Sequence, residues 1–334
     1  MTLRVGINGF GRIGRSILRA ALLRNVDLEF VGINDLTAPE QLLLSFKYDS
    51  IHGVYKEQVQ LDGSYLLVGG NKIRITAEKD PTKLPWGELA VDAVVDSTGV
   101  FKKREQLEGH LKAGAKKVLL AVPPSGDLDA TVVMGVNDSV LKPEMKLVSN
   151  ASCTTNCAAP VVKVLHDHFG ARRGYMITVH AYTNDQRLLD FPHKDLRRAR
   201  AATLSIIPTT TGAAKMIGKV IPALAGKFQG MSYRVPVADG SVTDMVIELD
   251  KQVTVKDINE AMKQESMTRL RGILEYTNDP IVSVDIINNP HSSVFDSLLT
   301  QTLNGNWVKV SSWYDNEWGY SNRMIDLIER LFYL

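Results

Sequence analysis

The first 33 residues carry the pattern that most restricts how this chain can fold. Apolar residues alternate over 3–7, the glycine-rich segment G-F-G-R-I-G follows at 9–14, and apolar residues then recur at helical spacing over 17–22. A second apolar run occupies 28–33. Alternation is typical of a strand, and a spacing of three to four residues is typical of a helix. The segment therefore predicts a β-α-β unit, which requires a parallel sheet.

More strands and helices are expected in the rest of the first half of the chain. Strands are predicted at 73–76, 93–96, 118–122 and 146–149, with a helix between Lys103 and Ala113. Strands that alternate with helices favour a doubly wound parallel sheet.

After residue 153 the pattern changes. A helix is predicted over 154–169, and longer strands follow, with two helices among them and a last helix over 317–331. The predicted strands are 175–182, 231–237, 241–249, 281–287 and a hairpin pair around Asn304-Gly305-Asn306; the two helices are 212–224 and one that begins at the capping-box pattern Thr254 to Asp257. These strands indicate a mixed or antiparallel sheet.

Length and composition agree with two globular domains. The chain has 334 residues, of which 44% are hydrophobic and 23% charged, and domains average roughly 150 residues. The net charge is only +2, whereas dedicated nucleic-acid or membrane-surface proteins usually have a marked basic excess. No apolar run is long enough to span a membrane, and the N-terminus lacks the apolar core of a signal peptide. We expect a cytoplasmic protein without dedicated nucleic-acid binding.

The glycines Gly9, Gly11 and Gly14 have a mechanical interpretation. They allow a tight turn, close approach of a pyrophosphate to the backbone, and close packing of helix on strand. Asp35 ends the second predicted strand, where its carboxylate can bind an adenosine ribose and repel a 2′-phosphate. The cofactor is therefore expected to be NAD rather than NADP. The alternatives are a glycine turn without a ligand, and an Asp35 that caps a turn or a helix.

The cysteines Cys153 and Cys157 are the only two in the sequence. Two are too few for a disulfide framework or a Cys-built zinc site, and no metal is expected. Cys153 falls at the start of a predicted helix, where the helix N-terminus favours a thiolate and a lowered pKa. Cys157 lies one turn later, where a packed and inert thiol is expected. Cys153 is the candidate nucleophile, although a structural role is the alternative.

His180 ends an apolar strand and precedes a polar loop. An imidazole near a thiol can hold it as an ion pair and then act as acid and base. The sequence cannot show that this histidine meets Cys153, and a structural histidine is the alternative. Six others compete for the role: His52, His110, His166, His168, His193 and His291.

Three further segments point to anions. Thr209 to Gly212 opens a predicted helix with hydroxyls and N–H groups that could bind phosphate or simply cap the helix. Arg234 lies between apolar residues of a strand, so it requires an acidic partner or an anionic ligand. The basic run 194–200 could touch nucleic acid, but with a low net charge a salt-bridged or subunit-facing segment is the preferred interpretation.

Several longer segments are far more specific than the glycine turn. They are I-N-G-F-G-R-I-G-R from Ile7, S-N-A-S-C-T-T-N-C from Ser149, H-A-Y-T-N-D-Q-R from His180, H-K-D-L-R-R-A-R from His193, P-T-T-T-G-A-A-K from Pro208 and W-Y-D-N-E-W-G-Y-S-N-R from Trp313. Through them the sequence resembles the phosphorylating glyceraldehyde-3-phosphate dehydrogenases over essentially its full length.

That resemblance implies an α/β protein of two domains in a homotetramer. A Rossmann-type, doubly wound parallel sheet forms an NAD-binding domain over 1–152, completed by a C-terminal helix at 316–334. An α+β catalytic domain over 153–315 has a mixed, largely antiparallel sheet. The implied activity is the NAD-dependent oxidation and phosphorylation of glyceraldehyde 3-phosphate to 1,3-bisphosphoglycerate, in glycolysis or gluconeogenesis.

The resemblance also assigns roles to individual residues. Cys153 attacks the aldehyde to form a thiohemiacetal, His180 takes the hydroxyl proton as hydride leaves for NAD, and inorganic phosphate then attacks the thioester. The Cys153 N–H and His180 would stabilise the oxyanion. The remaining assignments are Thr183, Asp185 and Arg234 for the substrate phosphate; Ser152, Thr154, Arg198, Thr211 and Gly212 for inorganic phosphate; and Gly9, Gly11, Arg12, Ile13, Gly14, Asp35, Thr98 and Asn316 for the cofactor.

Three short segments bear on how close the match is. Ala121-Val122 stands where a Ser or Thr followed by Ala is usual near the nicotinamide, and Asp239-Gly240 where Asn-Val is frequent. Phe191-Pro192 resembles the Leu-Pro pair of NAD-using members, with a bulkier first residue.

The competing hypotheses are an erythrose-4-phosphate dehydrogenase, an aspartate-semialdehyde dehydrogenase, and a protein that mainly binds RNA or a surface partner. Retention of Thr183-Asn184-Asp185 and Thr209 to Thr211 argues for the three-carbon substrate.

Overall fold

The computed structural model describes residues 2–333, and the chain divides into two compact units. The first comprises Met1–Val132, Ser139–Ala151 and Ser321–Leu334, and the second comprises Val133–Asp138 and Ser152–Tyr320. The short segment Val133–Asp138 thus belongs to the second unit, although the sequence placed it inside the first domain.

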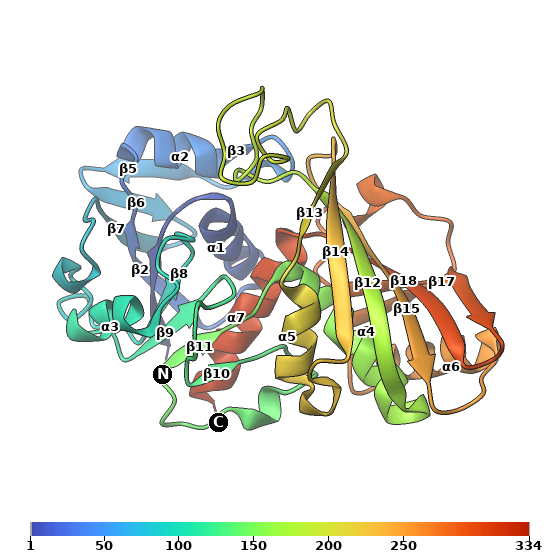
Figure 1. The fold of residues 1–334 in the computed structure, drawn as a ribbon. Helices are drawn as coiled ribbons and strands as arrows, with labels where there is room; N and C mark the ends of the chain where they lie inside the picture. The colour runs from blue at the N-terminus through green and yellow to red at the C-terminus, as the bar shows by residue number, and fades with distance from the viewer. Residues whose placement is uncertain (1, 334) are drawn as a thin grey trace. The chain divides into compact units, whose positions relative to one another are not determined.

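The first unit contains the predicted β-α-β unit and the strands expected after it (Figure 1). Its elements are β1 (Leu3–Asn8), α1 (Arg12–Arg24), β2 (Leu28–Asn34), α2 (Pro39–Lys47), β3 (Tyr48–Asp49), β4 (Gly53–Val54), β5 (Val59–Asp62), β6 (Tyr65–Val68), β7 (Asn71–Thr76), a 3-10 turn (Pro81–Lys83), β8 (Ala93–Asp96), α3 (Arg104–Lys112), β9 (Lys117–Leu120), β10 (Ala130–Thr131) and β11 (Leu147–Ser149).

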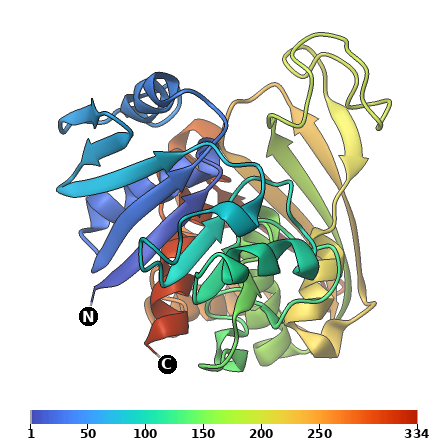
Figure 2. The ribbon, with the colours of Figure 1, turned by 90° about the vertical axis from the view of Figure 1, so that its left-hand side faces the viewer.

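Within residues 2–333, the main sheet of this unit has nine strands in the order β10-β11-β9-β8-β1-β2-β7-β6-β5. From β10 to β7 every neighbouring pair is parallel, and β5 and β6 add an antiparallel edge. Figure 2 shows the blue strands of this sheet side by side. The predicted parallel, doubly wound architecture is confirmed. Strand β8 is buried along its whole length, as expected of a parallel strand inside a sheet covered on both faces.

The C-terminal part of α7 (Trp318–Phe332) belongs to the first unit from Ser321 onward. It lies beside α1, where Arg24 forms an ion pair of 2.7 Å with Asp326. Lys117 of β9 donates to the Leu331 carbonyl at 3.0 Å. The end of the chain is therefore tied to both α1 and the sheet.

The second unit is built around a mixed sheet (Figure 1). Its elements are α4 (Cys153–Phe169), β12 (Ala171–Ala181), β13 (Ile207–Thr210), α5 (Ala213–Val220), a 3-10 turn (Pro222–Leu224), β14 (Phe228–Val235), β15 (Ser241–Leu249), α6 (Val255–Met267), β16 (Leu274–Thr277), a 3-10 turn (Ser283–Ile286), β17 (Ser293–Leu303), β18 (Trp307–Tyr314) and the first residues of α7.

Among the described residues this sheet has seven strands, in the order β13-β14-β12-β15-β18-β17-β16. The pairs β12–β14 and β16–β17 are parallel and the others are antiparallel. The mixed, largely antiparallel sheet is thus confirmed, as is the hairpin, where Gly305 adopts a φ of 73° between β17 and β18. Helices α4, α5 and α6 pack against these strands.

One predicted strand is wrong. Residues 281–287 were expected to be extended, but Ser283–Ile286 forms a 3-10 turn. The Asp285 carboxylate accepts a hydrogen bond of 2.8 Å from the Val282 N–H, which closes the turn. Val282 and Val284 are both exposed. The apolar run therefore does not mark a buried strand here, because a local side-chain bond to the backbone competes with sheet pairing.

Candidate active site

The thiol of Cys153 begins helix α4, as the sequence predicted. Ser152 is the N-cap, and its hydroxyl accepts a hydrogen bond of 3.1 Å from the Thr155 N–H. Gly170 ends the helix in the left-handed conformation, with φ of 73°. These caps explain why the helix starts and stops where it does. They place the thiol at the positive end of the helix, where it remains partly exposed.

His180 lies near the end of β12, and its Nε2 is 3.5 Å from the Cys153 Sγ. The sequence identified these two residues as separate candidates, and the structure places their side chains next to each other. The side chain of His180 is 4% exposed. Of the competitors, His110 bonds to Trp86 and Asp96, and His168 to Glu265.

Arg234 stands next to His180 because β12 and β14 pair in parallel with these two residues in register. Its Nη1 is 2.9 Å from the Ala181 carbonyl oxygen and 2.6 Å from the His180 Nδ1. The same carbonyl lies 2.6 Å from Nδ1. When Nδ1–H donates to this carbonyl, Nε2 is free to accept the thiol proton. When Nδ1 instead accepts from Arg234, the proton is on Nε2 and faces the sulfur.

Burial governs the titration of this pair. It raises the pKa of the Cys153 thiol, while the Arg234 charge and hydrogen bonds from Thr154 oppose the shift. Burial, with the Arg234 charge as the next cause, lowers the pKa of His180 to about 3. Both effects favour a neutral thiol beside a neutral imidazole in the free protein. The predicted lowering of the thiol pKa is therefore wrong in direction, because the tertiary structure desolvates a sulfur that the isolated helix end would stabilise.

Tyr314 is a residue of this site that the sequence analysis missed. Its hydroxyl lies 2.9 Å from the Thr154 Oγ1 and 2.9 Å from the Thr178 Oγ1. The tyrosine ring meets the His180 ring edge to face, with centroids 5.9 Å apart. The Thr154 hydroxyl, expected to bind phosphate, thus points to a buried phenol. Tyr314 belongs to the W-Y-D-N-E-W-G-Y-S-N-R segment, which was its only signal in the sequence.

Arg234 has no carboxylate within ion-pair distance in residues 2–333, and its buried Nε has no hydrogen-bond partner there. The positive charge of Arg198 also reaches this site, where it contributes to lowering the pKa of His180 and of Arg234. Two guanidinium groups near one neutral thiol form a positive site. Of the two partners expected for Arg234, residues 2–333 supply no carboxylate within ion-pair distance, and the anionic ligand stays a prediction.

Arg198 itself is held by neighbouring polar groups. It forms an ion pair with Asp185, and its Nε donates to the Thr209 hydroxyl at 2.8 Å. Asp185 also lies 3.5 Å from the His193 Nε2. These contacts hold down the pKa of Asp185. The basic run 194–200 is thus partly salt-bridged, as preferred above, since Arg200 also pairs with Asp190 at 3.0 Å.

The other residues expected at phosphate sites make local bonds. The Thr211 Oγ1 accepts from the Ala213 N–H at 3.2 Å, and Gly212 is the N-cap of α5. The Thr183 N–H donates to the Gln186 side chain at 3.3 Å. Thr211 therefore fits the capping alternative as well as the binding one.

Cys157 is buried, as expected of a packed thiol. Its sulfur lies 3.7 Å from the Ser293 hydroxyl and 3.5 Å from the Ser312 carbonyl oxygen. Burial raises its pKa to about 12. Such a thiol is neither ionised nor accessible at neutral pH.

A second candidate site lies wholly within the first unit, at the carboxyl ends of its strands. A cleft of about 460 Å³ is lined there by Gly9, Gly11, Asp35, Thr98 and their neighbours. Gly9 has φ of 89°, and a Cβ on it would lie 2.7 Å from the Thr98 nitrogen. A Cβ on Gly14 would lie 2.3 Å from the Gly9 carbonyl oxygen, whereas one on Gly11 would meet nothing within 4 Å.

These three glycines fit a dinucleotide. Gly9 and Gly14 are required by the turn and by helix packing, while the space in front of Gly11 is open toward the cleft. Helix α1 begins at Arg12 with no side-chain cap and no acidic residue in its first turn. Its N–H groups are therefore suited to hold a pyrophosphate. Ile13 lies in the same turn.

Asp35 and Arg12 are already engaged in the free protein. The Asp35 carboxylate accepts from the Phe10 N–H at 2.7 Å and from the Thr37 N–H at 2.9 Å. Arg12 makes two bonds of 3.1 Å to Asp49. Asp35 thus serves the turn, which was the alternative, and lines the cleft as well. The Arg12 side chain is thus held by Asp49, while its residue begins helix α1.

Asn316, predicted to contact the cofactor, follows β18 in the second unit and is buried. Its Oδ1 accepts a hydrogen bond of 2.6 Å from the Ser241 hydroxyl. That bond fixes which way the amide faces.

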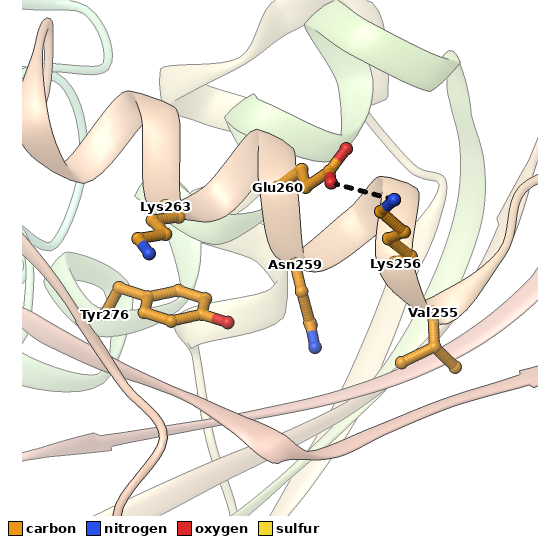
Figure 3. A pocket seen from close by; sticks show the side chains of 6 residues that line it. All are labelled: Val255, Lys256, Asn259, Glu260, Lys263 and Tyr276. Atoms are coloured by element: carbon orange, nitrogen blue, oxygen red, sulfur yellow. Dashed lines mark ion pairs between the residues drawn. The ribbon is translucent and has the colours of Figure 1, made fainter.

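A further pocket, lined by residues of α6 and β16, lacks the features of the two sites described above (Figure 3). Lys256 pairs with Glu260 at 3.6 Å, and Lys263 lies over the Tyr276 ring. Asn259 donates to the Ser297 carbonyl at 3.1 Å. The lining contains no nucleophile and no unpaired buried polar group, so we assign it no role.

Two family models match separate parts of the chain. A family model for the glyceraldehyde 3-phosphate dehydrogenase NAD-binding domain matches residues 3–104, and one for the C-terminal domain matches 152–316. A glyceraldehyde-3-phosphate dehydrogenase of Geobacillus stearothermophilus is 55% identical over 328 residues, which is 98% of this chain and 97% of the relative. Those of Mycobacterium avium and Borreliella burgdorferi are 54% and 52% identical, over 98% of this chain and 98% and 99% of theirs. Within residues 2–333, no helix is long and apolar enough to cross a membrane.

Proposed function

The chain belongs to the glyceraldehyde-3-phosphate dehydrogenase family, and we propose that Cys153 and His180 perform the family's reaction in it. It is an NAD-dependent oxidoreductase of glycolysis, which oxidises and phosphorylates glyceraldehyde 3-phosphate to 1,3-bisphosphoglycerate. The observation that supports the assignment of residues is the 3.5 Å distance from Sγ to Nε2 beside an arginine without an acidic partner.

The first step is addition of the sulfur to the aldehyde. The Cys153 Sγ forms a bond to the carbonyl carbon, the π bond opens, and the thiol proton moves to the His180 Nε2. The oxyanion then takes that proton, which gives a thiohemiacetal and restores a neutral imidazole. A neutral resting pair suits this step, because the base must be unprotonated when the sulfur attacks.

The second step is oxidation. Nε2 accepts the hydroxyl proton while the carbonyl re-forms as a thioester. NAD supplies the hydride acceptor when it is bound in the cleft of the first unit. Inorganic phosphate then attacks the thioester carbon, the C–S bond breaks, the leaving sulfur takes back the proton held at Nε2, and the acyl phosphate is released. A thioester keeps the energy of the oxidation available for that transfer.

We assign the anion sites to the two arginines. Arg234, with Thr183 and Asp185, binds the phosphate of the substrate, and Arg198 holds the incoming phosphate with Ser152, Thr154, Thr211 and Gly212. Support comes from the Nε of Arg234, which is buried without a partner. A phosphate oxygen would supply the acceptor that this group lacks.

The test is NADH production from glyceraldehyde 3-phosphate, with and without inorganic phosphate. We expect turnover that depends on phosphate, loss of at least about 1,000-fold for Cys153→Ser because a hydroxyl is a far weaker nucleophile at neutral pH, and nearly normal turnover for Cys157→Ser. Turnover that persists in Cys153→Ser would refute the assignment.

The competing hypotheses have less support. The curated relatives are glyceraldehyde-3-phosphate dehydrogenases, so the four-carbon sugar phosphate is not favoured. In the basic run, Arg198 and Arg200 are each paired with an aspartate. That pairing reduces the charge available to RNA.

A homotetramer is the proposed assembly. Support comes from a projecting, yellow-green segment of the second unit that extends beyond β13 and β14 (Figures 1 and 2). Its large apolar side chains are each at least 66% exposed: Leu188, Leu189, Phe191, Leu196, Leu204 and Ile206. Such a concentration is unusual on a free surface and typical of subunit contacts.

Light scattering measures that assembly. Leu196→Asp is expected to lower the mass of the particle, while Leu23→Asp, on the similarly exposed surface of α1, leaves it unchanged. A monomeric wild type would contradict the proposal. The cytoplasm is the proposed location, where both free cysteines stay reduced.

A further inference from the structure

A row of polar side chains crosses the first sheet at the carboxyl ends of four neighbouring strands. Asp96, Asn8 and Asn34 occupy matching register positions on β8, β1 and β2, and Thr76 follows on β7. The first three are 0%, 2% and 4% exposed. Burying such a row is costly unless each member is hydrogen-bonded.

The side-chain bonds between members of this row all donate toward Asp96. The Thr76 hydroxyl donates to the Asn34 Oδ1 at 3.0 Å, and the Asn34 Nδ2 donates to the Asn8 Oδ1 at 2.8 Å. The Asn8 Nδ2 then donates to the Asp96 Oδ2 at 2.8 Å. Each amide therefore accepts on its β7 side and donates on its β8 side, and the row ends on a carboxylate.

A second line of donors reaches the same carboxylate from the other side. The Trp86 Nε1–H donates to the His110 Nδ1 at 3.0 Å. Because an indole N–H can only donate, Nδ1 is the acceptor and the ring proton is placed on Nε2. That Nε2–H donates to the Asp96 Oδ2 at 3.1 Å. The Trp86 ring is packed so closely on Gly6 and Gly32 that a Cβ on either would lie within 2.9 Å of it.

Asp96 is thus the common acceptor of four donors. Its Oδ2 receives Asn8 and His110, and its Oδ1 receives the hydroxyl and the N–H of Thr98 at 2.7 and 3.2 Å. No lysine or arginine in residues 2–333 pairs with it. Every donor faces a carboxylate oxygen, so an uncharged amide in this place would turn an NH₂ group toward donors.

Both ends of the row reach the walls of the dinucleotide cleft. The Thr98 hydroxyl accepts the Val100 N–H at 3.1 Å, and both residues line one wall. The Asn34 Oδ1 accepts the Glu78 N–H at 2.8 Å, and its Nδ2 donates to the Glu78 carbonyl at 2.9 Å; both residues also line the cleft. Asp96 is not itself among the lining residues.

We propose that Asp96 is a positioning residue for NAD. Its carboxylate holds Thr98 and Val100 in the place that the cofactor requires, and the row through Asn8 and Asn34 joins that wall to Glu78. The proposal rests on the function proposed for this cleft. It assigns a role in cofactor affinity to a buried acid, and to Trp86 and His110 as its outer support, although none of them touches the cofactor.

The test is NAD binding by calorimetry in the absence of substrate, on Asp96→Asn. We expect the Kd for NAD to rise at least tenfold, with a matching rise in its KM, while kcat at saturating NAD and the KM for glyceraldehyde 3-phosphate stay within twofold. Asp92→Asn is the matched control: it lies just before the same strand and accepts the Arg4 N–H at 2.9 Å, away from the cleft. It should lose stability but keep its NAD affinity within twofold.

Hydrogen exchange provides a second readout on the same samples. Peptides over residues 97–101 should exchange faster in Asp96→Asn, while those over β8 do not. If wild type binds NAD and a folded Asp96→Asn binds it equally well, the positioning role is refuted and the proposed function stands. If wild type does not bind NAD, the proposed function itself fails.

A further pair keeps the proposal testable if Asp96→Asn does not fold. Thr98→Val removes the hydroxyl that links Asp96 to the Val100 N–H, and Thr98→Ser retains it. We expect weaker NAD binding for the first and near wild-type binding for the second. Equal affinity in both would refute the link.

Discussion

His180 and Arg234 are direct cross-strand neighbours in a parallel pair, and the Arg234 Nη1 lies 2.6 Å from the His180 Nδ1. A cation so close to an imidazole opposes its protonation, and burial acts in the same direction. The same cation favours a negative sulfur. One arginine thus keeps the base neutral and lowers the cost of forming the nucleophile.

The first prediction concerns the titration of Cys153. Because burial raises its pKa, alkylation by iodoacetamide in the free protein should accelerate with pH through a midpoint above the ordinary thiol value of about 8.5. Arg234→Leu removes the charge that opposes the shift, so the midpoint should move further up. Cys157 should react only on unfolding. A rate that is already maximal at pH 6 would contradict the prediction.

The second prediction concerns cofactor choice. Asp35→Gly removes the carboxylate that would face the 2′-position of the ribose. The ratio of kcat/KM for NAD to that for NADP should fall by at least about tenfold, which corresponds to about 1.4 kcal/mol. Because Asp35 also accepts the Phe10 N–H, some loss of NAD affinity is expected as well. Thr37→Ala, beside the same turn, should leave the ratio unchanged.

The third prediction separates two glycines of the turn. Gly14→Ala would place a Cβ 2.3 Å from the Gly9 carbonyl oxygen, so it should destabilise the fold by about 1–3 kcal/mol. Gly11→Ala meets nothing within 4 Å and should leave the melting temperature nearly unchanged. It should weaken NAD binding, because its methyl group occupies the space proposed for the pyrophosphate. Calorimetry with and without NAD would measure both effects, and equal NAD affinity in Gly11→Ala would count against the cleft.

The fourth prediction concerns acid stability. Asp49 accepts the Arg12 guanidinium and the N–H groups of Ile51 and His52, and these bonds hold its pKa below the ordinary value despite burial. A depressed carboxyl pKa stabilises the fold above the unfolded-state pKa of about 3.9 and loses this effect as the pH falls. Asp49→Asn should therefore cost about 1–3 kcal/mol at pH 7.

The difference in unfolding free energy between Asp49→Asn and wild type should shrink below about pH 4. Denaturant titrations at pH 7 and pH 3.5 would measure it. A difference that is the same at both values would show that the bonds to Asp49 do not depend on its charge.

Much of the fold could be predicted because its signals are local. The glycine turn, the Thr254 capping box and the Asn304-Gly305 hairpin each specify a backbone conformation within a few residues. The strand predicted over 281–287 was wrong because an apolar run alone does not distinguish a strand from a turn. The hydrogen bond from the Val282 N–H to the Asp285 carboxylate stabilises the turn instead.

Local sequence patterns specify most helices and strands, the parallel arrangement around the glycine turn, and the position of Cys153 at a helix start. Long-range packing brings together the groups that meet at the site: His180 with Cys153, Arg234 with His180, and Tyr314 with Thr154. It also reversed the predicted shift of the thiol pKa. The two kinds of feature differ in how far apart in the sequence the interacting residues lie. Caps and turns are formed by bonds between near neighbours, whereas strand register and desolvation depend on residues dozens to more than a hundred positions apart, which no local pattern encodes.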